Sequence, residues 1–448
     1  MRRFLTYIIP FVTVVVMVSC GESSSTIATS NIAKLKTFYL AGHDSIKGLK
    51  EAKFIIEEGL DTGVVRNVDS IRYGTPMTRV VPRFSCEATP GSVKIQLGDT
   101  TITVSGSDTL DFTRTPIYMT IVSSDLTKRK TYEIQTTVHS VDPDLYEWKT
   151  LSTNMYPVED EEQQVVLLGD KFYLYCNNGF SNRVYTSFDA ATWTEAEFNG
   201  LPDVCRVKGI LSDGKKLYYG ENGKLFTTED GLNWDIVDYS DKDFTIETML
   251  MSFNDTVWLV LEDKVTEDLL LGQIAADTIR RTEMVLDYNF PISGFATVTF
   301  ESMSGRLRAS IIGGYSRSGE CVNSRWNIEY APTIEGLYRI MNYSIEQPEF
   351  STLTGISVVW YKKQLMMFGG VDKDMVYRGN KILVSVDEGY TWTLADTTKC
   401  VLPATYGSRQ KQSVLVKDNN LYVIGGQNQQ QTFADSYRGR LNSIDWDE

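Results

Sequence analysis

A phrase near residue 370 is the sequence feature that most constrains the fold. An apolar run, residues 364–368, leads into Gly369-Gly370, and a polar loop and a second apolar run follow. A tight turn at Asp387-Glu388-Gly389 is then closed by Trp392. Short apolar runs bounded by glycine and Asp/Gly turns are typical of β-strands. The phrase therefore predicts one blade of a β-propeller, provided that it repeats along the chain.

The phrase does repeat, at intervals of roughly 40–60 residues, which is the spacing of propeller blades. Six units can be aligned by their strand pairs or strand-and-turn segments: 171–176 with 187–193, 215–220 with 228–234, 256–261 with 269–274, 306–314 with 325–330, 364–370 with 385–392, and 421–426 with 441–446. The third unit is the most degenerate, so a seven-bladed ring stays open as an alternative.

The sixth unit lacks a fourth strand after its third, because the chain ends at Glu448. In the first, second and fifth units the fourth strand begins with a tryptophan, and residues 147–151 (Glu-Trp-Lys-Thr-Leu) have the same pattern. We expect residues 146–151 to supply the outer strand of the sixth blade and close the ring, which removes free sheet edges. In an open ring, Trp148 would instead be a linker residue without strand partners.

The first twenty residues have the pattern of a lipoprotein signal peptide. Arg2-Arg3 precede an apolar stretch, residues 4–18, and Ser19-Cys20-Gly21 follow in the manner of a lipoprotein cleavage site. Lipidation at Cys20 would place the mature chain on a membrane through a tether at residues 21–31. Gly21 favours the outer membrane, with its periplasmic or surface side left open. The alternative is an ordinary signal peptide or membrane anchor with an incidental cysteine.

Residues 32–142 read as a separate β-rich domain. Ile117, Met119 and Ile121 alternate with other residues, as do Tyr132 and Ile134, which predicts two sheets packed face to face. Residues 105–112, Pro116 and 130–134 together resemble the immunoglobulin-like modules that follow the tether in many Bacteroidetes lipoproteins. The resemblance implies a spacer role. Asp142-Pro143-Asp144 marks the junction with the propeller at residues 143–448.

The Gly-Gly pairs at 313–314, 369–370 and 425–426, with aromatic residues downstream, resemble kelch repeats of the type in the central domain of galactose oxidase. Residues 385–392 are similar to the Asp-box of sialidase-type propellers. The whole arrangement resembles a Bacteroidetes lipoprotein family of unknown function. The expected fold is thus all-β, an immunoglobulin-like β-sandwich followed by a six-bladed kelch-like propeller. The resemblance implies a location and a shape, without a reaction.

Composition excludes several functions. Residues 143–448 carry 28 basic and 44 acidic side chains, and a field of that sign repels nucleic acid. Both histidines, His43 and His139, precede the propeller, so the ring cannot build a histidine copper site or a Ser-His-Asp triad. The sialidase signature is absent. We predict no metal, no cofactor and no disulfide framework, with free thiols at Cys86, Cys176, Cys205, Cys321 and Cys400.

The loops between second and third strands and the blade junctions should share one face of the ring, and the Asp-box turns should occupy the other. Asp189, Asp230 and Asp387 are accordingly interpreted as turn-capping residues. Aromatic and charged side chains on the first face suit a sugar. The candidate ligand-binding residues are Tyr315, Arg317, Arg325, Asp372, Tyr377, Arg378, Tyr406, Arg409, Tyr437 and Arg438.

The opposing interpretation is that these are solvated or structural positions. Tyr377-Arg378-Gly379 recurs as Tyr437-Arg438-Gly439, and such repetition favours a role between sheets. The first functional hypothesis is a non-enzymatic, monomeric, membrane-tethered protein that binds a carbohydrate or a partner protein. The alternative is a saccharide-acting enzyme, such as a sugar mutarotase, glycosidase or lyase, for which Asp372 and Asp374 are one possible carboxylate pair. A purely structural scaffold is the third possibility.

Overall fold

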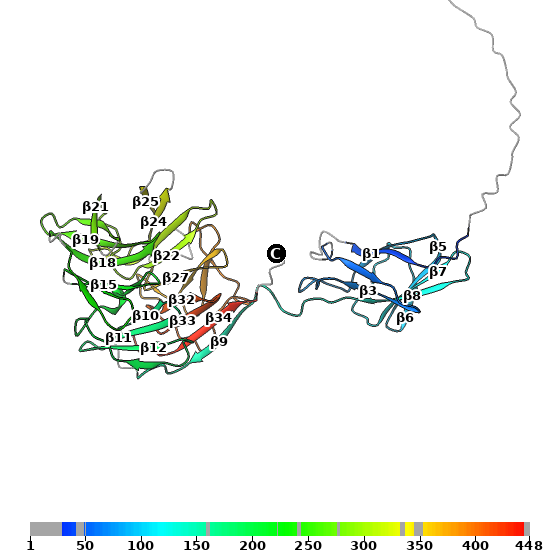
Figure 1. The fold of residues 1–448 in the computed structure, drawn as a ribbon, viewed down its shortest axis with the longest axis horizontal. Helices are drawn as coiled ribbons and strands as arrows, with labels where there is room; N and C mark the ends of the chain where they lie inside the picture. Colours follow the sequence, from blue (N-terminus) through cyan, green and yellow to red (C-terminus); the bar gives the residue numbers. More distant parts are fainter. Residues whose placement is uncertain are drawn as a thin grey trace, which may run out of the picture. The chain divides into compact units, whose positions relative to one another are not determined.

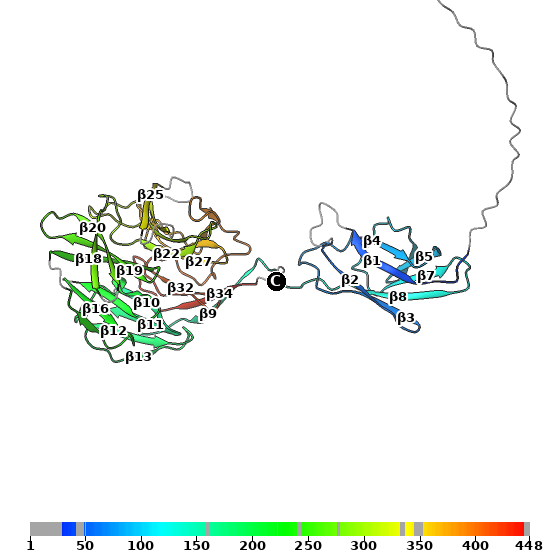
Figure 2. The same cartoon turned by 45° about the horizontal axis from the view of Figure 1, so that its top comes forward.

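The computed structural model describes residues 29–41, 49, 51–157, 162–221, 223–239, 243–275, 278–331, 337–344 and 353–442. The predicted signal peptide, Cys20 and most of the tether lie outside these ranges. The chain divides into two compact units, Met1–Asp142 and Pro143–Glu448, each drawn in Figure 1 and Figure 2. Both are built from strands, and no helix in the described ranges is long and apolar enough to cross a membrane.

The first unit contains a six-stranded sheet in the order β2-β3-β8-β7-β5-β6 and a two-stranded sheet, β1-β4. Strands β3 and β8 run parallel, while the other pairs are antiparallel. The bounds are β1 (Leu35–Ala41), β2 (Phe54–Glu57), β3 (Thr62–Asn67), β4 (Val81–Cys86), β5 (Pro90–Leu97), β6 (Thr100–Thr103), β7 (Ile117–Ser123) and β8 (Arg129–Gln135).

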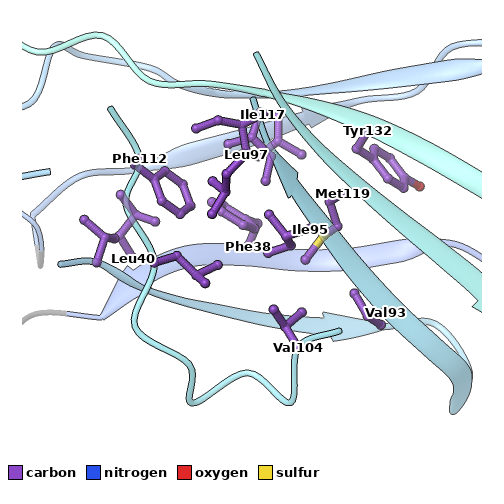
Figure 3. Packing of buried hydrophobic residues seen from close by; sticks show 14 of the residues in the cluster. Phe38, Leu40, Val93, Ile95, Leu97, Val104, Phe112, Ile117, Met119 and Tyr132 are labelled. Atoms are coloured by element: carbon purple, nitrogen blue, oxygen red, sulfur yellow. The ribbon is translucent and has the colours of Figure 1, made fainter. Parts of the chain in front are cut away.

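One hydrophobic core joins these two sheets. Ile117, Met119 and Ile121 on β7 are buried while the residues between them are partly exposed, which confirms the predicted alternation. Phe38 on β1 is buried in the same core, and Figure 3 shows it close to Ile95. A period of two places every second side chain on one face, so alternation and burial have the same cause.

The second unit contains six four-stranded antiparallel sheets among its described residues. Their orders are β10-β11-β12-β13, β14-β15-β16-β17, β18-β19-β20-β21, β22-β23-β24-β25, β27-β28-β30-β31 and β32-β33-β34-β9. A short pair, β26-β29, lies beside the fifth sheet in sequence. We number the sheets one to six in this order.

The first three sheets are formed by β10 (Glu162–Leu168), β11 (Lys171–Asn177), β12 (Asn182–Ser187), β13 (Thr194–Ala196), β14 (Leu211–Ser212), β15 (Leu217–Glu221), β16 (Lys224–Thr228), β17 (Asp235–Val237), β18 (Phe244–Phe253), β19 (Thr256–Asp263), β20 (Leu269–Ala275) and β21 (Thr278–Val285). A single 3-10 turn in the described residues, η1 (Val207–Gly209), precedes β14.

The remaining strands are β22 (Ala296–Glu301), β23 (Leu307–Ile312), β24 (Ser324–Ala331), β25 (Leu337–Ser344), β26 (Leu353–Thr354), β27 (Ser357–Tyr361), β28 (Gln364–Phe368), β29 (Val371–Asp372), β30 (Ile382–Ser385), β31 (Thr393–Leu394), β32 (Ser413–Lys417), β33 (Asn420–Ile424), β34 (Ser436–Leu441) and β9 (Tyr146–Ser152).

The outer strand of the sixth sheet comes from the beginning of the unit. β9 pairs antiparallel with β34, with Trp148 opposite Gly439, and the two strands lie side by side in Figure 1. This confirms the strand partner predicted for residues 146–151. The third strand of that sheet is Ser436–Leu441, so its assignment to residues 441–446 was wrong. The error arose because Leu441 was taken as the start of an apolar run that in fact ends there.

Six hydrophobic clusters join the sheets in a closed cycle. Neighbouring sheets share a cluster at each step from one to six, and the last sheet then packs on the first. In that closing cluster, Phe172 and Leu174 of β11 meet Tyr422 and Ile424 of β33. A cycle of this kind leaves no sheet face without a neighbour, which is the architecture of a propeller.

Candidate functional site

The Asp-box turns are hydrogen-bonded caps. Asp387 Oδ1 accepts the backbone N–H of Thr391 at 2.8 Å and the hydroxyl of Ser385 at 2.8 Å. Asp189 and Asp230 accept equivalent bonds in sheets one and two. These contacts support the structural interpretation of the three aspartates, because each carboxylate satisfies backbone donors that the turn leaves open.

The Gly-Gly pairs make room for a glutamine of the next sheet. Gly369 has a φ of +58°, and a Cβ built there would lie 2.4 Å from Gln412 Oε1. Gln412 Nε2 donates to the carbonyl of Phe368 at 2.7 Å. Gln163 makes the corresponding bond to the Gly426 carbonyl at 3.0 Å. The glycines are needed because the neighbouring side chain approaches their backbone at a positive φ.

Arg409, a candidate ligand-binding residue, is 1% exposed and lies within the sixth sheet's loops. Its guanidinium forms an ion pair with Asp435, with one N–H···O contact of 2.9 Å, and donates to the carbonyls of Gly407 and Gly425. The rings of Tyr406 and Phe433 lie 4.1 and 3.7 Å from its Cζ. This side chain is fully used in cross-linking the loop.

Tyr406 and Tyr437 belong to the same buried cluster. Their rings are 5.7 Å apart in an edge-on arrangement, and Tyr437 donates to Asp435 at 2.9 Å. Burial raises the pKa of the Tyr406 hydroxyl. The candidates Arg409, Tyr406 and Tyr437 are therefore brought together by the fold, but in the interior, where they cannot meet a ligand on the surface. Their expected contact with a ligand is corrected to a structural role.

Arg325 on β24 is completely buried between the fourth and fifth sheets. Its Nη1 donates to the carbonyl of Glu388 at 2.7 Å, and its Cζ lies 4.1 Å from the Tyr390 ring and 5.0 Å from the Tyr343 ring. Desolvation lowers the pKa of this guanidinium. Arg325 too joins one sheet to the Asp-box turn of the next, and its expected role in binding is corrected in the same way.

The other candidates lie nearer the surface without forming one cluster in the described residues. Arg317 is exposed and pairs with Glu262, whereas Asp372 Oδ1 caps its own loop through the N–H groups of Asp374 and Val376, each at 2.9 Å. Tyr315 is partly buried and holds the start of its loop through a backbone bridge to Ser293. Tyr377 and Arg378 are partly buried, and Arg438 is exposed.

A buried charge cluster between the fourth and fifth sheets had no sequence signal. Arg308 pairs with Glu329 at 2.7 Å and with Glu388, and Arg306 also reaches Glu329 at 2.7 Å. Burial acts to lower the pKa of Arg308, but hydrogen bonding to Glu329 and the charge of Glu388 outweigh it and raise that pKa. The cluster lies on the same sheet interface as Arg325 and stabilises it.

A pocket opens beside the fourth sheet, with a volume of about 320 Å³. Its lining is polar and comes from three segments: Asn289 before β22, residues 320–324 before and at the start of β24, and Asn342 on β25. Ser324 is 7% exposed, and its Oγ has no hydrogen-bond partner among the described residues. A buried hydroxyl without a partner is energetically unfavourable unless a ligand or water completes it.

The pocket lies at the loop that sequence reasoning selected, residues 315–325, but uses other residues of it. Alternation along β24 explains the difference, since Arg325 faces the fifth sheet and Ser324 faces the opposite side. Asn289 and Asn342 are separated from this loop in sequence, so only the sheet brings them together.

Cys86, Cys176, Cys205, Cys321 and Cys400 are free thiols, as predicted, with Cys176, Cys205 and Cys400 buried. Burial raises the pKa of Cys205 and of Cys400 to about 12, so these thiols are unreactive at neutral pH. Within the described ranges, His, Cys, Asp and Glu side chains form no group of three or more placed to hold a metal ion.

Comparison with known proteins identifies the family. Residues 142–448 match the DUF6242 beta propeller domain, and residues 19–136 match the N-terminal domain of the same family, a domain of unknown function. The chain therefore belongs to the DUF6242 family, and its second unit is a β-propeller domain. No curated protein matches the chain.

Two solved structures are among those similar to this chain. The structure of YjhT is 11% identical with a TM-score of 0.47, and the match covers 64% of this chain and 96% of that one. The Penicillium chrysogenum alpha-L-arabinanase, solved with arabinobiose, is 9% identical with a TM-score of 0.43, covering 65% of this chain and 98% of that one.

Proposed function

We propose that the propeller of this DUF6242 family member is a carbohydrate-binding module, and that the ligand occupies the pocket beside the fourth sheet. The observation that carries the proposal is Ser324 Oγ, a buried hydroxyl in the pocket lining that lacks a partner among the described residues. A ligand hydroxyl would satisfy it. Pairing such a group converts an unfavourable burial into a favourable contact.

The chemistry of the lining suits neutral hydroxyl groups. Asn289, Asn323 and Asn342 contribute amides, each able to donate and accept, and Glu320 contributes acceptors. Neighbouring sugar hydroxyls present the same mixture of donors and acceptors. A volume of about 320 Å³ lies at the lower end of small-molecule pockets, which span about 300–1,000 Å³. The pocket fits a small sugar or the end of a glycan.

Binding is favoured over hydrolysis at this pocket. Glycoside hydrolysis generally uses two carboxyl groups flanking the bond, and Glu320 is the one carboxylate among the pocket-lining residues. The candidate pair Asp372 and Asp374 lies in a different loop, where Asp372 is occupied in capping. The pocket is therefore equipped to recognise a saccharide without cleaving it.

The proposal includes the setting of the module. The six sheets are the blades of a kelch-like ring, residues 32–142 form an immunoglobulin-like spacer, and the monomeric chain is anchored to the outer membrane by lipid at Cys20. The cyclic packing of the six sheets and the Gly-Gly pairs support the first point. The Ser19-Cys20-Gly21 pattern supports the last.

A glycan array followed by titration calorimetry tests the binding. A soluble chain of residues 21–448 should bind at least one neutral saccharide, and Ser324→Ala and Asn342→Ala should each weaken binding about tenfold, the loss of one hydrogen bond of roughly 1.4 kcal/mol. Ser181→Ala, in the corresponding loop of the first sheet, is the matched control and should bind normally. The idea fails if no saccharide binds or if both pocket variants bind like the control.

The anchor is tested separately. Cells producing the full chain are labelled with radioactive palmitate and fractionated. Lipid label and membrane association should both disappear in a Cys20→Ser variant. A protein that remains in the membrane fraction unlabelled would show an ordinary membrane anchor instead.

A further inference from the structure

A lysine amine lies where three inner strands of the ring begin. Lys208 is in the turn η1, just before β14 of the second sheet. Its Nζ donates to Gln164 Oε1 of β10 at 2.9 Å and to the backbone carbonyl of Lys411, just before β32 of the sixth sheet, at 2.6 Å. Inner strands surround a propeller's central channel. The amine is therefore at the channel end that carries the sheet-to-sheet connections.

The surroundings of this amine favour its neutral form. Burial lowers the pKa of Lys208 to about 7, and the positive charge of Lys411 acts in the same direction. Glu162 and Cys176 act against them. A neutral amine is the nucleophilic form of lysine, and desolvation is a general means of producing it near neutral pH.

The two hydrogen bonds also orient the amine. In the neutral form, its two N–H groups can both be used by the acceptors on Gln164 and Lys411, which leaves the nitrogen lone pair directed elsewhere. The Lys208 side chain is only partly enclosed, so the channel end is not sealed around it. An oriented lone pair in a partly open site is the geometry that a nucleophile needs.

We propose that Lys208 is a carbonyl-reactive residue that forms an imine with a small aldehyde or ketone, such as the open-chain form of a sugar. The nitrogen lone pair forms the C–N bond, and the carbonyl π electrons move to oxygen, which takes up a proton. The carbinolamine then loses its hydroxyl group with one proton as water, which leaves a protonated imine. The carboxylate of Glu162 lowers the energy of that cation. This inference is independent of the pocket beside the fourth sheet.

Trapping of the imine tests the proposal on the intact chain of residues 21–448. The protein is incubated with glycolaldehyde and cyanoborohydride between pH 5 and 9, and modified lysines are quantified by peptide mass spectrometry. At pH 7, Lys208 should be modified at least tenfold faster than the exposed Lys215, with a rate midpoint near pH 7. A lysine that serves only to tie the sheets together would be protected, and modification no faster than at Lys215 overturns the proposal.

A second variant separates reactivity from simple exposure. Because Glu162 acts to raise the pKa of Lys208, Glu162→Gln should move the rate midpoint to lower pH while leaving Lys215 unchanged. An unchanged midpoint would show that the modification does not depend on the described surroundings and would also count against the proposal.

Discussion

At the residue scale, the buried arginines show what a sequence can and cannot indicate. An arginine in a loop between strands is normally exposed, and on that basis Arg325 and Arg409 were expected to face a ligand. Each instead lies between aromatic rings contributed by segments far away in the chain. Hydrophobic periodicity carries no information about such partners. The repeated Tyr-Arg-Gly motif was the available signal that some of these positions are structural.

The pocket illustrates the same limit. The loop at residues 315–325 was selected from its length and polarity, and part of it does line the pocket. Ser324 was not selected, because a serine at a strand start has no distinguishing pattern. Its importance follows only from its burial and its unpartnered Oγ.

Arg409→Met should strongly destabilise the propeller. The change leaves Asp435 without its ion-pair partner, and removing one member of a buried pair costs about 3–5 kcal/mol. Arg438→Met, at the exposed position beside Tyr437, should change stability by no more than about 0.5 kcal/mol. Calorimetric unfolding of the full chain measures both, and equal effects of the two variants would contradict a structural role for Arg409.

The Asp-box turn of the second sheet should contribute a pH-dependent stability. Burial acts to raise the pKa of Asp230, but bonds from Asn233, Leu232 and Thr228 outweigh it and hold that pKa at about 2. A lowered carboxyl pKa stabilises the folded state above the normal value of 3.8, and this gain disappears as pH falls through about 2. Asp230→Asn should therefore be less stable than the parent chain at pH 7 and nearly equal to it at pH 2. Because the carboxylate is largely exposed, the difference at pH 7 should be about 1 kcal/mol.

At the element scale, strands with a repeated phrase could be predicted and strands without one could not. Residues 146–151 were identified as the closing strand because Trp148 repeats the tryptophan of earlier units. The parallel pairing of β3 with β8 had no such signal. Pairing between strands separated by many residues is decided by tertiary packing, to which local pattern is blind.

The pairing of β9 with β34 should depend on the close fit of Gly439 against Trp148. A Cβ at Gly439 would lie 2.6 Å from the indole ring, so Gly439→Ala should destabilise the propeller by about 1–3 kcal/mol through overpacking. Trp148→Ala removes the obstructing ring. The two changes combined should cost less than the sum of their separate effects, since they share one contact. Simple additivity in a calorimetric double-mutant cycle would argue against this fit.

At the scale of the whole molecule, the closed cycle of six hydrophobic interfaces explains why sites are confined to edges. Each sheet face is covered by its neighbour, so side chains on the faces hold the ring together, as Arg325 does. Loops and channel ends are what remain for ligands. The pocket at Ser324 and the amine of Lys208 both lie at such edges.

The net charge of the propeller should restrict which saccharides bind. Residues 143–448 carry 16 more acidic than basic side chains, and this excess repels anionic ligands over a distance set by salt, about 8 Å at physiological ionic strength. Affinity for a neutral saccharide should therefore be nearly unchanged between 20 and 300 mM NaCl. A uronic-acid or sulfated analogue should bind more weakly and gain affinity as salt rises, because added ions screen the repulsion. Titration calorimetry at the two salt concentrations makes the comparison. Tighter binding of the anionic analogue at low salt would mean that a local positive group, rather than the overall field, governs recognition.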